Sequence, residues 1–129
     1  MPAMPRVLFV DDDDDALQML LVRIEATFLT ASLRSAAPMW KYTEEFKPDV
    51  LVISDQLRHG RHDAKALIGK LRERGFKQSV LVLTDHEQPG DEARWQEWGA
   101  NGVALHPTRV EKRLDRMAMQ LAILAGAAR

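Results

Sequence analysis

The chain contains no cysteine among its 129 residues. This absence excludes disulfide bonds, thiolate metal sites and cysteine nucleophiles, and it suits a reducing compartment such as the cytoplasm. Net charge is also nearly absent, since the formal value at pH 7 is -1. A chain without a basic excess lacks the long-range attraction that nucleic-acid binding normally uses, so we expect no direct contact with nucleic acid.

Two further features are missing. The apolar runs are no longer than a strand, well short of the roughly 18 residues of a transmembrane helix, and the apolar stretch near the N-terminus is too short for a secretory signal. The sequence also has no glycine-rich phosphate loop of the GxGxxG or GxxxxGK type. We therefore expect a cytoplasmic protein that does not span a membrane and has no dinucleotide or nucleoside-triphosphate site.

What the sequence does contain is a regular alternation of two patterns. Short runs of β-branched and aliphatic residues, typical of strands buried on both faces, alternate with segments that carry apolar residues at helical spacing. This order predicts one α/β domain, a five-stranded, doubly wound parallel sheet with right-handed crossovers. The predicted strands cover residues 7–10, 28–32, 50–55, 79–84 and 103–105, and a helix is predicted after each, including one over residues 36–46 and one over residues 92–98.

Three of the predicted strands lead into polar side chains. Asp11 and Asp12 follow the first, Asp55 ends the third and Thr84 ends the fourth. The carboxyl ends of parallel strands share one edge of a sheet, where open α/β proteins place their sites, so we expect these side chains to converge. Two carboxylates about 5 Å apart repel by roughly 3 kcal/mol at an effective dielectric of 20, so this edge favours a divalent cation. Hard oxygen ligands suit Mg²⁺ or Mn²⁺.

Four segments together resemble the receiver domains of two-component response regulators, namely VLFVDDD, PDVLVISD, VLVLTD and GANGVALHP in that order. The resemblance covers about residues 6–125 of a single receiver domain that we expect to span residues 1–129. It implies the (βα)5 flavodoxin-like receiver fold and a signalling role rather than an enzyme. The implied partners are a sensor histidine kinase or phosphotransfer protein and a downstream effector protein.

The resemblance also implies roles for individual residues. Asp55 is the phosphoacceptor, and it binds the metal ion together with Asp11, Asp12 and the backbone carbonyl of Leu57. Thr84 is the hydroxyl that bonds to the phosphoryl oxygen and moves when the domain switches. The chemistry of these groups agrees, because a carboxylate is already a nucleophile and a cation would offset the charge of the incoming phosphoryl group.

The sequence departs from the family pattern beside this predicted site. His106 stands where the family has a lysine that pairs with the phosphoryl group, and a histidine is largely neutral at pH 7 unless acidic neighbours raise its pKa. Asp85 replaces a small residue after the switch hydroxyl, and Val103 replaces an aromatic switch residue. These departures favour a second hypothesis, a pseudo-receiver that acts as an unphosphorylated protein-interaction module. A third hypothesis is a small metal-dependent phosphatase that uses the same carboxylates.

The sequence also suggests an output face, a second kind of metal site and a dimer contact. The face made by the fourth helix, fifth strand and fifth helix is where receivers typically dimerise or meet partners, so Trp98 and Val103 are candidates for an output face. The four histidines near the site edge permit a transition-metal site, although their spacing matches no zinc motif. Apolar residues at alternating four- and three-residue steps predict the core face of the last helix and leave a homodimer seam open, at Val110, Leu114, Met117, Leu121 and Leu124.

Overall fold

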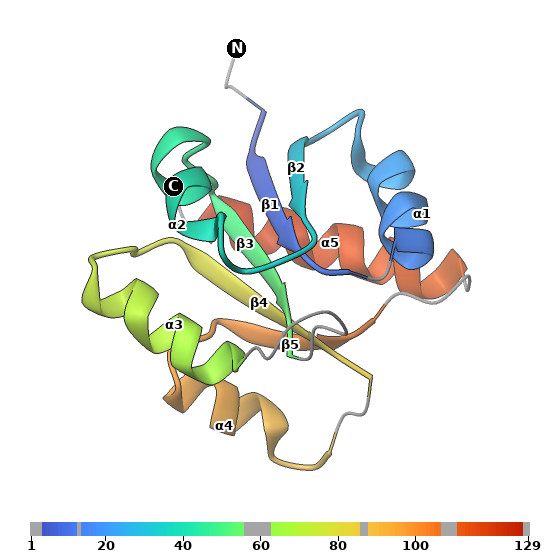
Figure 1. Ribbon diagram of the computed structural model, residues 1–129. Helices are drawn as coiled ribbons and strands as arrows, with labels where there is room; N and C mark the ends of the chain where they lie inside the picture. The colour runs from blue at the N-terminus through green and yellow to red at the C-terminus, as the bar shows by residue number, and fades with distance from the viewer. Residues whose placement is uncertain (1–3, 13, 56–62, 86–87, 107–110, 128–129) are drawn as a thin grey trace.

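A computed structural model describes residues 4–12, 14–55, 63–85, 88–106 and 111–127. It confirms the predicted alternation of strands and helices (Figure 1). The elements are, in order, β1 (Arg6–Val10), α1 (Asp14–Ile24), β2 (Leu29–Leu33), α2 (Met39–Glu45), β3 (Val50–Ser54), α3 (Ala64–Glu73), β4 (Ser79–Thr84), α4 (Asp91–Glu97), β5 (Gly102–Leu105) and α5 (Glu111–Ala127).

The five strands form one parallel sheet in the order β2-β1-β3-β4-β5. The chain first steps from β1 to β2 and then returns to place β3 on the other side of β1. The strand order therefore reverses between β1 and β3, and in open α/β sheets the crevice beyond the carboxyl ends of such a strand pair is where ligands bind. This topology places Asp11 and Asp55, which follow these two strands, at that crevice.

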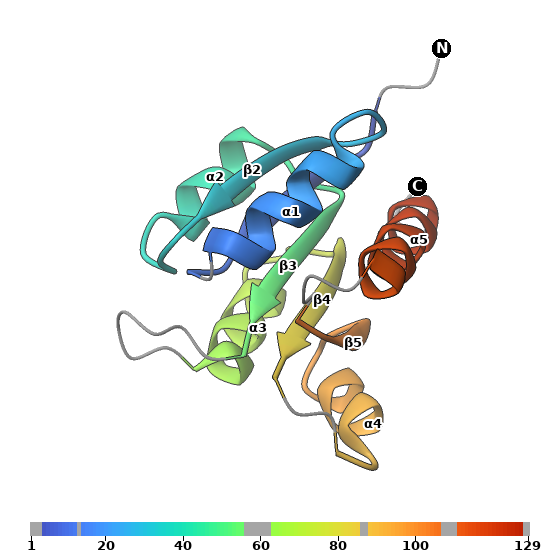
Figure 2. The same ribbon diagram turned by 90° about the vertical axis from the view of Figure 1, so that its right-hand side faces the viewer.

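Helices cover both faces of the sheet, as Figure 2 shows. Helices α1 and α5 pack on one face, where Leu20 and Leu121 meet Phe9 in a buried cluster. Helices α2, α3 and α4 pack on the other, where Met39 and Ile68 belong to a second cluster. All five residues of β3 are buried, because the central strand is covered on both sides, as its unbroken apolar sequence predicts.

Several element boundaries differ from the predicted ones by one to three residues, and two of these differences bear on the argument. Helix α2 begins at Met39 instead of residue 36, because the preceding residues form a turn in which the Met39 N–H donates to the Ala36 carbonyl at 3.0 Å. Strand β3 ends at Ser54, so Asp55 lies just beyond the strand. Within the described residues, no helix combines the length and apolarity that crossing a membrane requires.

Arg72 joins the end of α3 to the beginnings of two strands. Its guanidinium group donates to the carbonyls of Gly99, Phe76 and Gln78 and to the side-chain oxygen of Asn101, over distances of 2.7 to 3.0 Å. Five guanidinium N–H groups in a planar fork make this many bonds possible. The bonds connect α3 with the segments that lead into β4 and β5.

Candidate functional site

The sheet itself holds the residues of the predicted site in place. The Asp11 N–H donates to the Leu33 carbonyl at 3.0 Å, and the Asp55 N–H donates to the Leu83 carbonyl at 2.8 Å. The His106 N–H donates to the Thr84 carbonyl at 3.0 Å. Each bond continues the pairing of neighbouring strands by one residue, so these side chains start from backbone positions that the sheet determines.

The predicted acidic edge is largely buried. Asp11 is 3% exposed, Asp12 is 8% exposed and Thr84 is 5% exposed, whereas Asp55 is half-buried. Removing a carboxylate from water is costly unless a cation or hydrogen-bond donors compensate it. Two adjacent buried carboxylates therefore require a cation or hydrogen-bond donors close by.

His106 lies in the middle of this edge. Its Nε2 is 3.3 Å from Asp11 Oδ2 and 3.2 Å from Ser54 Oγ. Its Nδ1 is 3.0 Å from Asp85 Oδ1. That last pair is close enough for a hydrogen bond, but its direction is poor, and Nδ1 is buried without an aligned hydrogen-bond partner. His106 and Asp85 therefore form an ion pair when the ring is protonated.

The surroundings of His106 act on its pKa in opposite directions. Burial alone lowers the pKa, because it disfavours the charged ring. The hydrogen bond to Asp11 and the negative charges of Asp11, Asp85 and Asp55 raise the pKa by more than burial lowers it. The net effect is a pKa above the ordinary value for histidine, so the acids of this edge favour the imidazolium form that places a positive charge among them.

Comparison with known proteins identifies the fold. The chain aligns with a Francisella response regulator receiver domain over 97% of its own length and 99% of the other, at 19% identity and a TM-score of 0.82. It aligns with a response regulator from Thermotoga maritima over 96% of its own length and 99% of the other, at 18% identity and a TM-score of 0.80. It also aligns with a signal receiver domain from Vibrio parahaemolyticus over 98% of its own length and 93% of the other, at 16% identity and a TM-score of 0.83.

The chain has the receiver fold. The similarity covers nearly the whole of each chain compared, and it confirms the five-stranded flavodoxin-like architecture predicted from the sequence. No protein-family model and no curated protein matches the sequence. At identities below 20%, the similarity establishes the fold, and the chemistry has to be argued from the residues of this chain.

The acidic side chains at this edge are chemically suited to a hard divalent cation, but they are few. Asp11 and Asp12 are adjacent carboxylates, and Mg²⁺ commonly binds through one or two carboxylates while keeping several waters. Among the described residues, however, no group of three or more histidine or acidic side chains is arranged to hold a metal ion. Leu57, whose carbonyl is the remaining predicted ligand, lies outside the described residues. The metal site therefore stays a prediction.

Val103 and Trp98, the two residues predicted for the output face, differ in their burial and in their neighbours. Val103 is only 7% exposed and belongs to the core cluster on the α3 side of the sheet. Trp98 follows the last residue of α4 and is partly buried, with the Trp95 ring edge-on at 5.1 Å and the Lys65 ammonium group 4.4 Å above its ring. Neither side chain stands free at the surface, and their role in output stays a prediction.

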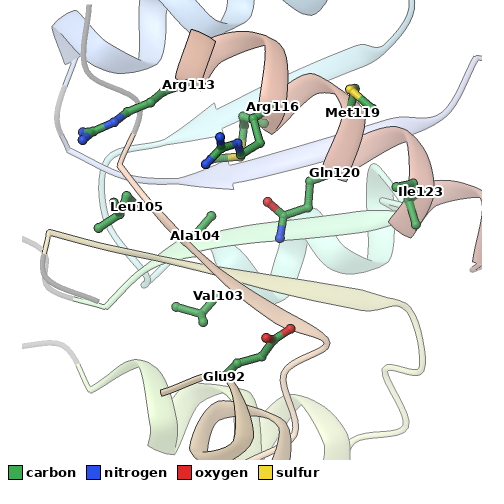
Figure 3. Close-up of a pocket in the computed structure, with 10 residues that line it drawn as sticks. Glu92, Val103, Ala104, Leu105, Arg113, Arg116, Met119, Gln120 and Ile123 are labelled. Atoms are coloured by element: carbon green, nitrogen blue, oxygen red, sulfur yellow. The ribbon is translucent and has the colours of Figure 1, made fainter. Parts of the chain in front are cut away.

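A groove between α4, β5 and α5 offers a more accessible surface on the same face (Figure 3). Its volume is about 460 Å³. Glu92 of α4 lies on one wall, Arg116 and Gln120 of α5 lie on the other, and Ala104 of β5 lies between them. Ile123, at the end of the α5 wall, is 68% exposed. The groove therefore combines an apolar rim with charges of both signs.

Sequence reasoning missed two features of this molecule. The first is that Asp85 is a partner of His106, although the parallel register pairs Thr84 with Leu105 and so makes the next two residues neighbours. The second is the exposure of Met119 and Ile123, which lie four residues apart in α5 and outside its buried stripe. The sequence did contain a signal for this exposure, because both residues are apolar and fall at helical spacing away from the predicted core positions.

Proposed function

We propose that this receiver accepts a phosphoryl group on Asp55 from the phosphohistidine of a sensor histidine kinase or phosphotransfer protein. In this reaction a carboxylate oxygen of Asp55 forms a bond to phosphorus while the bond between phosphorus and the imidazole nitrogen breaks. The departing imidazole takes a proton from solvent. The observation that carries the proposal is that His106 Nε2 lies 3.3 Å from Asp11 Oδ2, at the point of the receiver fold where the strand order reverses and where Asp55 follows β3.

Other residues of this edge have supporting roles in the proposal. Asp11 and Asp12, with Asp55 and the Leu57 carbonyl, would hold Mg²⁺ or Mn²⁺. The bound cation would supply the positive charge that phosphoryl transfer needs around its equatorial oxygens. Thr84 ends β4 beside this edge, and its hydroxyl is the group proposed to bond to the phosphoryl oxygen. His106 would supply charge in the place of the lysine that the family uses.

The direct test is the intact mass of the protein after incubation with acetyl phosphate and Mg²⁺. We expect the mass to rise by one phosphoryl group in the native protein and to stay unchanged in Asp55→Asn. A receiver of known activity, treated in parallel, verifies the reagent. An unmodified native protein beside a labelled reference receiver would contradict the proposal.

One observation favours the pseudo-receiver as a second candidate. The ring nitrogens of His106 already face Asp11 and Asp85, so positive charge at this edge is matched by carboxylates without any phosphoryl group. An interaction module of this kind would bind its partner equally well with Asp55 or with Asn at this position. The same mass experiment separates the two candidates, because a pseudo-receiver takes up no phosphoryl group.

For output, we propose that the groove between α4, β5 and α5 contacts either a downstream effector protein or a second copy of this chain. Two observations support this choice of surface. Met119 and Ile123 are among the most exposed large apolar side chains of the described residues, at 67% and 68%. The facing charges of Glu92 and Arg116 also allow two copies to exchange ion pairs across a two-fold axis.

A further inference from the structure

Asp85 differs from the other acids near His106 in its exposure. Its side chain is 71% exposed, whereas that of Asp11 is 4% exposed and the His106 ring between them is 11% exposed. Asp85 thus approaches the imidazole from the solvent side, and Asp11 approaches it from within the edge. The sequence marks Asp85 only as an additional negative charge, but the structure gives it a specific neighbour.

The two ring nitrogens of His106 have different surroundings. Nε2 lies 3.3 Å from Asp11 Oδ2 and 3.2 Å from Ser54 Oγ, so one end of the ring has two polar neighbours within the edge. Nδ1 has no aligned hydrogen-bond partner, and a buried ring nitrogen in that state is unfavourable. Asp85 Oδ1, at 3.0 Å, is within reach of Nδ1, and the exposed side chain has room to rotate into line.

We propose that Asp85 is a positioning residue for His106, holding the ring by Nδ1 so that Nε2 is directed at the acidic edge beside Asp55. This inference rests on the proposed function, because the ring that Asp85 orients lies at the edge where Asp55 is proposed to accept the phosphoryl group. The arrangement follows a general pattern in which a carboxylate bonded to one nitrogen of an imidazole orients the other nitrogen toward its task.

A plain electrostatic role for Asp85 leads to the opposite expectation. An exposed carboxylate close to Asp55 repels an anionic phosphoryl donor, so its neutralisation would speed phosphorylation whatever residue stands at position 106. If Asp85 positions His106, neutralising Asp85 slows phosphorylation instead, and it does so only while position 106 carries an imidazole. The sign of the effect therefore separates a positioning role from repulsion of the donor. Asp85 also raises the pKa of His106, but the influence of that shift on labelling disappears at a pH low enough to protonate the ring in every variant, where a positioning role still slows labelling.

The experiment compares the initial rate of Asp55 labelling by acetyl phosphate and Mg²⁺ in four proteins, at neutral pH and again at about pH 5, below the unperturbed pKa of histidine. These are the native protein, Asp85→Asn, His106→Lys and the double variant. We expect Asp85→Asn to be about tenfold slower than the native protein, the size of effect expected for losing one charge-assisted contact. In the His106→Lys background, Asp85→Asn should cause no slowing, because the lysine has no second ring nitrogen to hold. Equal or faster labelling of Asp85→Asn in the native background would overturn the proposal.

A second measurement does not depend on phosphorylation. The ¹⁵N chemical shifts of the His106 ring at neutral pH report which nitrogens carry protons and how they are bonded. We expect Asp85→Asn to shift the Nδ1 signal strongly and the exposed control Glu97→Gln, on α4, to leave it unchanged. Identical His106 signals in the native protein and Asp85→Asn would overturn the positioning role. This result would count even if neither protein were labelled by acetyl phosphate. Absent labelling with a shifted signal would overturn the phosphoacceptor role of Asp55 alone.

Discussion

At the scale of single residues, His106 links the stability of the protein to pH. Its pKa in the folded protein lies above the ordinary value, because the hydrogen bond and charge of Asp11, with the charges of Asp85 and Asp55, outweigh the effect of burial. A histidine with a raised pKa stabilises the fold fully at pH values below its unfolded pKa. The contribution is lost as the pH rises through the pKa of the folded state.

We therefore expect the free energy of unfolding of the native protein to fall, relative to that of His106→Gln, as the pH rises from about 6.5. The reason is that the native ring binds its proton more tightly when folded. Urea denaturation in metal-free buffer at a series of pH values measures the difference. The other three histidines are common to both proteins and cancel. Parallel pH profiles for the two proteins would show that the charges of Asp11 and Asp85 do not act on His106 as described.

The carboxylate of Asp12 allows a test of the predicted metal site. If Asp12 is a ligand, Asp12→Asn removes one charged oxygen donor and weakens Mg²⁺ binding, so the Mg²⁺ concentration for half-maximal labelling by acetyl phosphate should rise about tenfold or more. Removal of all divalent cations with a chelator should abolish labelling of the native protein. Asp49→Asn, which lies before β3 at the other end of the strands, serves as the control. An unchanged Mg²⁺ dependence in Asp12→Asn would remove this residue from the metal site.

At the scale of elements, Arg72 carries much of the connection between α3 and the strands β4 and β5. Its guanidinium group satisfies the carbonyls of Gly99, Phe76 and Gln78, which would otherwise lose their protein donor. Because β5 leads directly to His106, this connection also supports the position of the candidate site. The contribution of Arg72 is geometric, since it depends on several donors in one plane.

Arg72→Met should lower the free energy of unfolding by about 2 kcal/mol, because the alkyl packing is kept while several hydrogen bonds are lost. Lys70→Met, an exposed position on the same helix, should change it by less than about 0.5 kcal/mol. Urea denaturation followed by circular dichroism measures both. Similar stability losses in the two variants would mean that the bonds of Arg72 have no net value.

At the scale of the whole molecule, the exposed apolar side chains of α5 allow a test of the proposed contact surface. Val22 on α1 and Ile123 on α5 are exposed almost equally, at 67% and 68%, but only Ile123 lies at the groove beside β5. A charge at position 123 would be buried and unpaired in any complex formed through the groove. The same charge at position 22 would remain in solvent.

If the phosphorylated protein forms a dimer or an effector complex through the proposed groove, we expect Ile123→Glu to abolish that association in sedimentation experiments. Val22→Glu is the matched control and should leave the association unchanged. Both variants should unfold at nearly the same urea concentration as the native protein, since neither side chain is in the core. Equal loss of association in both variants would count against the groove as the contact surface.

The sequence by itself determined the order of the elements and which acids stand at the strand ends. Both are local properties: the apolar runs of β1, β3 and β4 are buried on two faces, and Asp11, Asp55 and Thr84 mark where those runs stop. Element boundaries such as the start of α2 were less well predicted, because a turn and a first helical turn have similar local patterns.

Only the tertiary structure decided what surrounds His106. The His106 ring meets Asp11 from β1, Ser54 from β3 and Asp85 from β4, and the distances among these groups depend on how the sheet is assembled. Local sequence pattern carries no information on such contacts, because they join segments far apart in the chain. For the same reason, the charge of His106 follows from its neighbours in space, which only the folded chain brings together.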